Sequence, residues 1–127
     1  MNFVPARLDA NGSGLRLHLS DSLSFPVPES CTAKYRDYVN KALIFGLRPE
    51  HITEMRGGEQ KPGEEFTATL DVVEPMGMDT MIYFCVNGVE VCGRVEPSSV
   101  TGVGETMQLR ANLKQMHLID AATHAII

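Results

Sequence analysis

The chain has 127 residues, 43% of them hydrophobic and 21% charged, with a formal net charge of −5. This length and composition are typical of one globular domain with its own core, so residues 1–127 are predicted to form a single domain. The negative charge and the scattered basic residues argue against nucleic-acid binding. The chain has three cysteines, and this odd number argues against a disulfide framework. The lack of a long apolar run argues against a membrane span.

The N-terminal part predicts a hairpin followed by a short edge strand. Apolar and polar residues alternate within residues 2–20, and Asn11-Gly12-Ser13-Gly14 interrupts them, which is typical of two antiparallel strands joined by a turn. Residues 24–28 contain two prolines, which cannot donate to a strand ladder. This segment is therefore predicted to lie at the edge of a sheet.

A short helical segment, a buried strand and a loop are predicted next. Residues 30–40 have room for one or two helical turns, and Ser30 or Thr32 is the expected cap because a hydroxyl accepts from free backbone amides. The apolar run 42–47 predicts a strand. The glycines, proline and charged residues of 56–65 favour a mobile loop.

The centre of the chain predicts a strand and then a tight hairpin. Residues 66–72 alternate between apolar and polar, and Glu74-Pro75-Met76-Gly77 is expected to end that strand. Asn87-Gly88 lies between the runs 81–86 and 89–95, and this dipeptide readily adopts the positive φ angles of a type I′ turn.

A two-residue turn at this place also fixes which residues share a face of the hairpin. It pairs Val86 with Val89 and Phe84 with Val91, so these four residues form one apolar face. Cys85 and Cys92 then lie diagonally on the other face, roughly 7–8 Å apart, which favours two free thiols over a disulfide. The residues expected on that second face are Tyr83, Cys85, Glu90 and Cys92.

The C-terminal part predicts a second loop and three more strands. Residues 97–104 are rich in Ser, Gly and Thr and indicate the loop, while 106–111, 115–120 and 123–127 indicate strands. Eight to ten short strands with turn signals between them are typical of a sandwich or barrel. The predicted fold class is all-β, a small, partly open barrel with at most one or two helical turns.

Motifs that would indicate catalysis or metal binding are missing from the sequence. The histidines and cysteines lack the spacing of a zinc site, no Gly-x-Ser-x-Gly is present, and no phosphate-binding Gly-x-x-x-x-Gly-Lys run occurs. We therefore expect no catalytic, cofactor-binding or metal-binding residues, although ligands or a triad brought together from remote positions stay open. The residues considered are His18, His51, His117, His124, Cys31, Cys85 and Cys92.

The densest group of ionisable residues beside apolar sequence is the corner Gly46-Leu47-Arg48-Pro49-Glu50-His51. Pro49 fixes its own φ and disfavours the α conformation at Arg48, so the strand should end in a stiff bend. Arg48, Glu50 and His51 either fix this bend or face a partner domain or small anion. The structural role is favoured because strand corners need fixing more often than they bind.

Four segments, in the right order, resemble a known family. They are Met1-Asn2-Phe3, the Gly46–His51 corner (family Gly-Ile-Arg-Pro-Glu-His), Val73-Glu74-Pro75-Met76-Gly77-Met78-Asp79-Thr80 (family Val-Glu-x-x-Gly-x-Asp/Glu-Thr) and His117-Leu118-Ile119-Asp120 (family His-Leu-Phe-Asp). The chain thus resembles the C-terminal regulatory domain of the ATP-binding subunits of sugar-type ABC importers, the maltose and glycerol-3-phosphate group. Ile119 departs from the family's usual Phe.

The resemblance implies an oligonucleotide/oligosaccharide-binding (OB)-like barrel, the transport-associated (TOBE) domain, following an ATPase domain that lies before residue 1. ATP and magnesium would bind that ATPase domain, and no cofactor is implied for this chain. The implied partners are a twin domain in a homodimer, the ATPase domain and, through it, the membrane permease subunits. The implied location is the cytoplasmic side of the cell membrane. The motif residues, expected to be structural, are Gly46, Arg48, Pro49, Glu50, His51, Glu74, Gly77, His117 and Asp120.

Two regions are candidates for the twin contact: the hairpin face with Tyr83, Cys85 and Cys92, and the segment Met76–Met81. Two other functions stay open. One is a stand-alone barrel that binds an oxyanion such as molybdate through Ser98-Ser99 and Thr101-Gly102-Val103-Gly104. The other is a small hydrolase assembled from remote residues.

Overall fold

The computed structural model describes residues 1–11, 14–21, 23–55 and 64–127, and most of these lie in short strands. The strands are β1 (Asn2–Asn11), β2 (Gly14–His18), β3 (Ser24–Pro26), β4 (Ala42–Leu47), β5 (Ile52–Glu54), β6 (Glu65–Thr69), β7 (Val72–Pro75), β8 (Thr80–Val86), β9 (Val89–Val95), β10 (Thr106–Ala111) and β11 (His117–Asp120). The helical elements are α1 (Glu29–Tyr35) and the 3-10 turns η1 (Arg36–Tyr38), η2 (Pro49–His51), η3 (Pro97–Ser99) and η4 (Leu113–Gln115).

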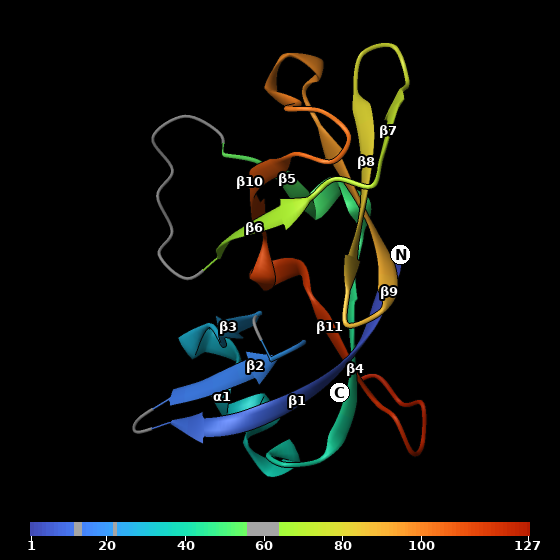
Figure 1. Cartoon of the computed structure of the whole chain (residues 1–127). Coiled ribbons are helices and arrows are strands. Elements are labelled where there is room, and N and C mark those ends of the chain that lie inside the picture. Colours follow the sequence, from blue (N-terminus) through green and yellow to red (C-terminus); the bar gives the residue numbers. More distant parts are fainter. Residues whose placement is uncertain (12–13, 22, 56–63) are drawn as a thin grey trace.

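The strands form three sheets arranged in two halves (Figure 1). A five-stranded sheet, in the order β11-β4-β1-β2-β3, makes the lower half together with α1. Two three-stranded sheets, β5-β10-β6 and β7-β8-β9, make the upper half. All the pairings within these sheets are antiparallel. The predicted all-β architecture, a partly open barrel, is confirmed.

One continuous apolar core holds the two halves together. Alternate residues of β1 and β2, among them Leu8 and Leu17, point inward from the lower half. The Phe66 ring contacts Phe25 of the lower half edge-on and Phe84 of β8, with 5.7 Å between ring centroids in both pairs. Aromatic pairs at such distances stabilise a core beyond their buried area alone.

The predicted hairpin around Asn87-Gly88 is confirmed. Both turn residues have positive φ, 52° and 76°. Val86 pairs with Val89 and Phe84 with Val91, as the two-residue turn requires.

The single strand predicted over residues 66–72 is wrong, because the chain changes sheets within it. β6 ends at Thr69, and the backbone of Leu70 bonds to Glu105 and Gly104 of the neighbouring loop. The amide of Asp71 then donates to the Tyr83 carbonyl, and β7 begins. Hydrogen bonds to these distant residues therefore change which side chains of this segment point inward.

The expected break at residues 74–77 also lies elsewhere. Val72 is 45% exposed rather than inward, and Glu74 and Pro75 belong to β7. The turn falls at Gly77 and Met78, where two-residue geometry and the positive φ of Gly77 allow β7 to pair with β8.

Two smaller expectations about helix and strand ends are also wrong. α1 begins at Glu29 after Pro28, without a side-chain cap; Thr32 lies inside the helix and donates to the Pro28 carbonyl. The strand predicted at 123–127 is reduced to a single bridge between Ile119 and Ile126. Within the predicted loop 56–65, residues 56–63 lie outside the described part and Glu65 begins β6.

Candidate functional site

The Gly46–His51 corner lies where β4 leaves the five-stranded sheet and η2 begins. Arg48 is extended, and the His51 amide donates to the Arg48 carbonyl across the turn that Pro49 starts. The Arg48 and Glu50 side chains face each other at 3.9 Å, but both are at least half exposed. Such a pair contributes little stability, so the bend is held mainly by its backbone.

Two motif residues, Gly46 and His117, lie side by side on neighbouring strands. They are register partners in β4 and β11. A Cβ at Gly46 would lie 3.2 Å from the Met1 sulfur and 3.5 Å from the Phe3 ring, so glycine leaves room for these N-terminal side chains. Met1 and Phe3 are about half exposed, at 48% and 51%.

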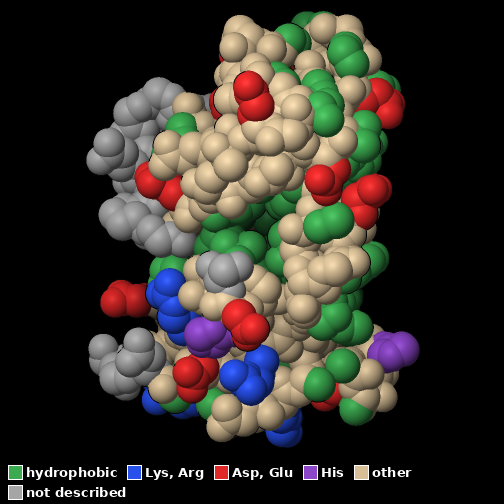
Figure 2. Space-filling view, viewed as in Figure 1, with side chains coloured by type: hydrophobic (Ala, Val, Ile, Leu, Met, Phe, Trp, Pro, Cys, Tyr) green, Lys and Arg blue, Asp and Glu red, His purple; other side chains and the backbone are tan. Residues whose placement is uncertain are grey.

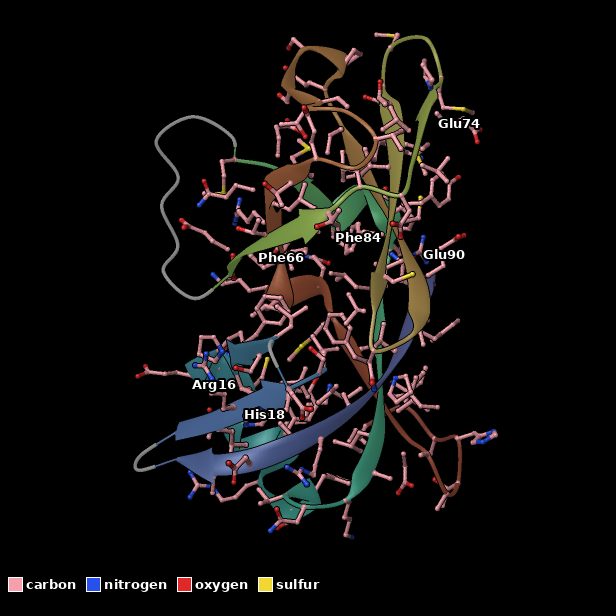
Figure 3. The ribbon with its side chains drawn as sticks, in the orientation of Figure 1. Arg16, His18, Phe66, Glu74, Phe84 and Glu90 are labelled. Atoms are coloured by element: carbon pink, nitrogen blue, oxygen red, sulfur yellow. The ribbon has the colours of Figure 1, made fainter. Side chains whose placement is uncertain are left out.

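The motif residues Glu74, Gly77 and Asp120 lie on β7, in the turn after it and at the end of β11. Glu74 is exposed on β7, in the upper part of the view in Figure 3. Gly77 takes a positive φ of 95° in the next turn, which the Met76 amide closes by donating to Asp79. Asp120 ends β11, and its carboxylate accepts from the amides of Ala122 and Thr123. The motif is therefore a set of separate corners and turns.

The two regions proposed for a twin contact belong to one surface, the outward face of the β7-β8-β9 sheet, which we call the outer sheet face. The inward side chains of this sheet, such as Ile82 and Phe84, are fully buried. The turn beside the outer face carries Met76 and Met78, exposed at 59% and 92%. Green apolar side chains are visible along this side of the molecule in Figure 2. The outer sheet face consists of Val72, Glu74, Met81, Tyr83, Cys85, Glu90, Cys92 and Arg94.

The two cysteines of this face are free thiols with low reactivity. Cys85 is exposed and Cys92 is partly buried, and the register places them diagonally, as predicted. A hydrogen bond with Asp71 is the main cause that raises the pKa of Cys85, whereas desolvation raises the pKa of Cys92. Because the thiolate is the nucleophilic form, both cysteines are weak nucleophiles at neutral pH.

Sequence reasoning missed Asn2, whose side chain closes the β9 edge of the β7-β8-β9 sheet. Its side-chain nitrogen donates to the Cys92 carbonyl at 2.7 Å, and its oxygen accepts from the Cys92 amide at 2.9 Å. The side chain thus replaces one residue of a neighbouring strand and ties β1 to β9. No sequence signal announces this contact, because the two residues are 90 positions apart.

Gly93 marks a second close contact that the sequence does not announce. A Cβ there would lie 3.0 Å from the Ile52 side chain and 3.1 Å from its carbonyl oxygen. Ile52 directly follows the corner, so this glycine lets β9 lie tightly against it. A lone glycine inside a strand pattern is the signal that could have found this position.

A third missed feature is a buried ion pair in the upper half. The Arg110 guanidinium lies 3.1 Å from the Glu64 carboxylate, and both side chains are about nine-tenths buried. Nearby in the fold, the buried Glu54 carboxylate accepts from the Glu96 amide. These groups fasten β5 and β10 to the segments beside them.

Several amides in and beside the loop 97–104, the candidate for binding an oxyanion, are engaged in backbone hydrogen bonds. Gly104 donates to the Leu70 carbonyl, Ser99 to Glu96 and Glu105 to Gly102. The Glu105 carboxylate lies 3.3 Å from where a Cβ on Gly102 would be, which places negative charge at the loop. Amides in use and an adjacent carboxylate both disfavour an anion here.

Across the described ranges, no group of three or more His, Cys, Asp or Glu side chains is arranged to hold a metal ion. None of the helices in that part of the chain is long and apolar enough to cross a membrane.

The fold defines a class of domain: a small OB-type barrel that is extended by a second group of strands. Two family models match it, the MalK OB fold domain over residues 1–52 and the TOBE domain over residues 45–119. The chain belongs to the TOBE domain family, in the form that accompanies the MalK-type OB fold.

The chain is similar to part of several transport ATP-binding proteins. The chain is 28% identical over its whole length to 33% of the sulfoquinovosyl glycerol transport ATP-binding protein SmoE of Agrobacterium fabrum. It is 34% identical over 72% of its length to 25% of the multiple sugar-binding transport ATP-binding protein MsmK of Streptococcus mutans. It is 28% identical over 97% of its length to 30% of the sn-glycerol-3-phosphate import ATP-binding protein UgpC of Chromobacterium violaceum. The chain thus spans a quarter to a third of the length of these relatives.

A solved structure shares the fold at low sequence identity. The cytoplasmic molybdate-binding protein ModG, crystallised with molybdate bound, superposes with a TM-score of 0.61 and 13% identity, over 92% of this chain and 94% of that one. At this identity the likeness concerns the fold alone.

Proposed function

We propose that this chain is the regulatory and dimerisation domain of the ATP-binding protein of an ABC transporter that imports a sugar or a sugar-phosphate-like solute. In this proposal an ATPase domain precedes residue 1 and carries the ATP and magnesium sites. The chain itself has no catalytic residue and holds no cofactor. The subunit lies on the cytoplasmic side of the membrane and contacts the permease subunits through its ATPase domain. The similarity to ATP-binding proteins of sugar and glycerol-phosphate transport, one of them an import protein, supports this proposal.

The outer sheet face is the observation that carries the dimerisation part. Val72 on this face is 45% exposed, and Met76 and Met78, in the turn that joins β7 to β8, are 59% and 92% exposed. Large apolar side chains gathered on one face are typical of a protein–protein contact. The rigidity of the paired strands would keep two subunits in register while attached ATPase domains move.

Sedimentation velocity on the chain tests the contact. Val72→Lys and Tyr83→Glu place charges in the middle of the outer sheet face and should shift the protein toward the monomer. Gln108→Lys, at an exposed position of β10, is the control and should sediment like the unchanged chain. If the outer-face variants sediment like this control, the outer sheet face is not the contact.

An ATPase assay separates this proposal from a small hydrolase. The isolated chain should release no phosphate from ATP, whereas the full-length subunit should do so with magnesium. Turnover by the chain alone would contradict the proposal.

The second candidate is an oxyanion-binding barrel, favoured by the fold shared with the molybdate-binding protein. The internal bonds of the 97–104 loop and the carboxylate of Glu105 weigh against it. Calorimetry with molybdate, sulfate and phosphate distinguishes the two candidates. Tight, stoichiometric binding of any of these anions would favour the oxyanion-binding barrel, and the absence of binding heat would favour the regulatory domain.

A further inference from the structure

A cleft lies between the two halves of the molecule, bordered by the edge strands β3 and β6. Its volume is about 660 Å³, within the range of pockets that hold small molecules. Figure 2 shows the hollow at mid-height, with apolar side chains at its floor. All five residues of β6 line it, as expected where the edge of a sheet borders an opening.

The floor of this cleft is aromatic. Phe66 is half-buried and Phe84 almost completely buried, and their rings are in contact. Figure 3 shows both side chains between the two halves, above Arg16. The Phe66 ring therefore offers part of its surface to the cleft, while Phe25 and Phe84 hold it in place.

The walls of the cleft are polar and carry both donors and acceptors. Glu65, Thr67 and Thr69 point to the face of β6 opposite to Phe66, border the cleft at the edge of the sheet, and provide a carboxylate and two hydroxyls. Arg16 faces them from β2; its Nε donates to the Ser24 hydroxyl at 2.8 Å and one terminal nitrogen to the Ser24 carbonyl at 3.4 Å. A guanidinium has five N–H donors, so Ser24 fixes the group and leaves donors for a ligand.

The charges of the lining select among ligand classes. One guanidinium, Arg16, is outnumbered by the two carboxylates Glu65 and Asp71. Two carboxylates repel an anion, and a phosphorylated or oxyanion ligand would bring more negative charge into the cleft. A hydroxyl both donates and accepts, so a neutral ligand with several hydroxyls can satisfy carboxylates, threonines and guanidinium together.

A second hollow adjoins the first and would accept a longer ligand. It has a volume of about 430 Å³, shares Ser20 and Asn87 with the cleft and extends over β1 toward Arg7 and His18. His18 lies 3.6 Å from the Asp9 carboxylate. The polar groups thus continue beyond the aromatic floor.

We propose that the cleft between β3 and β6 binds a neutral polyhydroxylated ligand, a sugar, with an apolar C–H face against Phe66 and its hydroxyls bonded to Arg16, Glu65 and Thr67. Aromatic rings pack well against apolar C–H groups, and the mixed donors and acceptors supply orientation. This site goes beyond the proposed dimerisation role and does not depend on it, because ligand binding by the chain can be measured whether or not the outer sheet face self-associates.

Saturation-transfer NMR with maltose, sucrose and trehalose at millimolar concentration tests the proposal on the chain as it stands. At least one sugar should receive saturation, and phosphate and molybdate should not compete. In titrations, Arg16→Gln and Thr67→Val should each weaken the apparent affinity about three- to tenfold, the loss expected for one hydrogen bond. Arg94→Gln and Thr101→Val, outside the cleft lining, are matched controls that should leave affinity unchanged.

Amide chemical shifts of the unchanged chain keep the test decisive if a cleft variant fails to fold. Sugar should move the amides of β6 and of residues around Arg16, and should leave those of Glu74, Met81 and Arg94, which lie on the outer sheet face away from the cleft lining, unmoved. Saturation transfer to none of the three sugars would overturn the proposal, as would shifts confined to surfaces outside the cleft. Competition by phosphate would assign the cleft to an anion instead, and equal losses in cleft and control variants would also reject it.

Discussion

Replacing Asn2 by alanine should destabilise the whole fold, although Asn2 is the second residue of the chain. The side chain is only 8% exposed and makes two hydrogen bonds, 2.7 and 2.9 Å long, to the backbone of Cys92. Alanine removes both and leaves the carbonyl and amide of Cys92 without these partners. At roughly 1 kcal/mol for each bond, the free energy of unfolding should fall by about 2 kcal/mol. For a domain of this length the melting temperature should fall by about 7 °C.

Urea unfolding monitored by circular dichroism measures this loss, with calorimetry for the melting temperature. Gln108→Ala, which removes an exposed amide from β10, is the control and should change the free energy by less than about 0.5 kcal/mol. If Asn2→Ala behaves like Gln108→Ala, then the bridge to Cys92 does not stabilise the fold in solution, and the argument that a side chain closes this sheet edge fails.

Asn2→Asp separates the donor from the acceptor. The new carboxylate still accepts from the Cys92 amide but places an oxygen against the Cys92 carbonyl, where Asn2 donates at 2.7 Å. A proton on that carboxyl restores the donor, so its folded-state pKa should lie above the ordinary value of about 3.9. The stability deficit relative to the unchanged chain should therefore be large at neutral pH and shrink as pH falls through the raised pKa. A deficit independent of pH would contradict this account.

Three further substitutions test separate contacts by chemical unfolding. Gly93→Ala brings a Cβ within 3.0 Å of the Ile52 side chain and should cost about 1–3 kcal/mol through overpacking; no loss would mean that the two strands separate easily. Glu64→Gln replaces the charged partner of a buried ion pair by a neutral amide and should cost about 1.5–3 kcal/mol, the range for a hydrogen bond between charged groups; if Glu64→Gln with Arg110→Met is no more stable than the sum of the singles predicts, the two groups are not coupled. Gly77→Ala meets no atom within 4 Å but strains a φ of 95°, so about 1 kcal/mol is expected, and Gly77→Asn should cost less; equal losses would point to a cause other than backbone strain.

The sequence predicted well those parts of the fold that depend on neighbours along the chain. The hairpin of β8 and β9 follows from a period of two and from Asn87-Gly88, because both its pattern and its turn are local. The exchange of sheets at Leu70 and Asp71 was missed because the alternation over 66–72 is continuous in the sequence. Only the distant partners Glu105 and Tyr83 decide where the ladder changes.

The candidate sites show the same division between local and long-range information. The corner and the turns carry enough local pattern to reveal the family. The Asn2 bridge, the Gly93 contact and the cleft each join residues far apart in the sequence, so no spacing rule could find them. The outer sheet face was found only in part, because the hairpin register showed which side chains of β8 and β9 share it but not that Val72 and Glu74 of β7 join them.

The corner is conspicuous in the sequence for a reason that lies in its backbone rather than in its charges. Residues 45–52 are shared by the two family matches, so the corner is where the OB part passes into the TOBE part. There the His51 carbonyl accepts from the Asn112 amide, and the next residue, Ile52, packs against Gly93 of β9. The bend thus meets both upper sheets within two residues, whereas the Arg48–Glu50 pair faces solvent. We infer that a stiff bend started by proline is needed because small changes in its direction would separate Ile52 from Gly93 and so part β5 from β9.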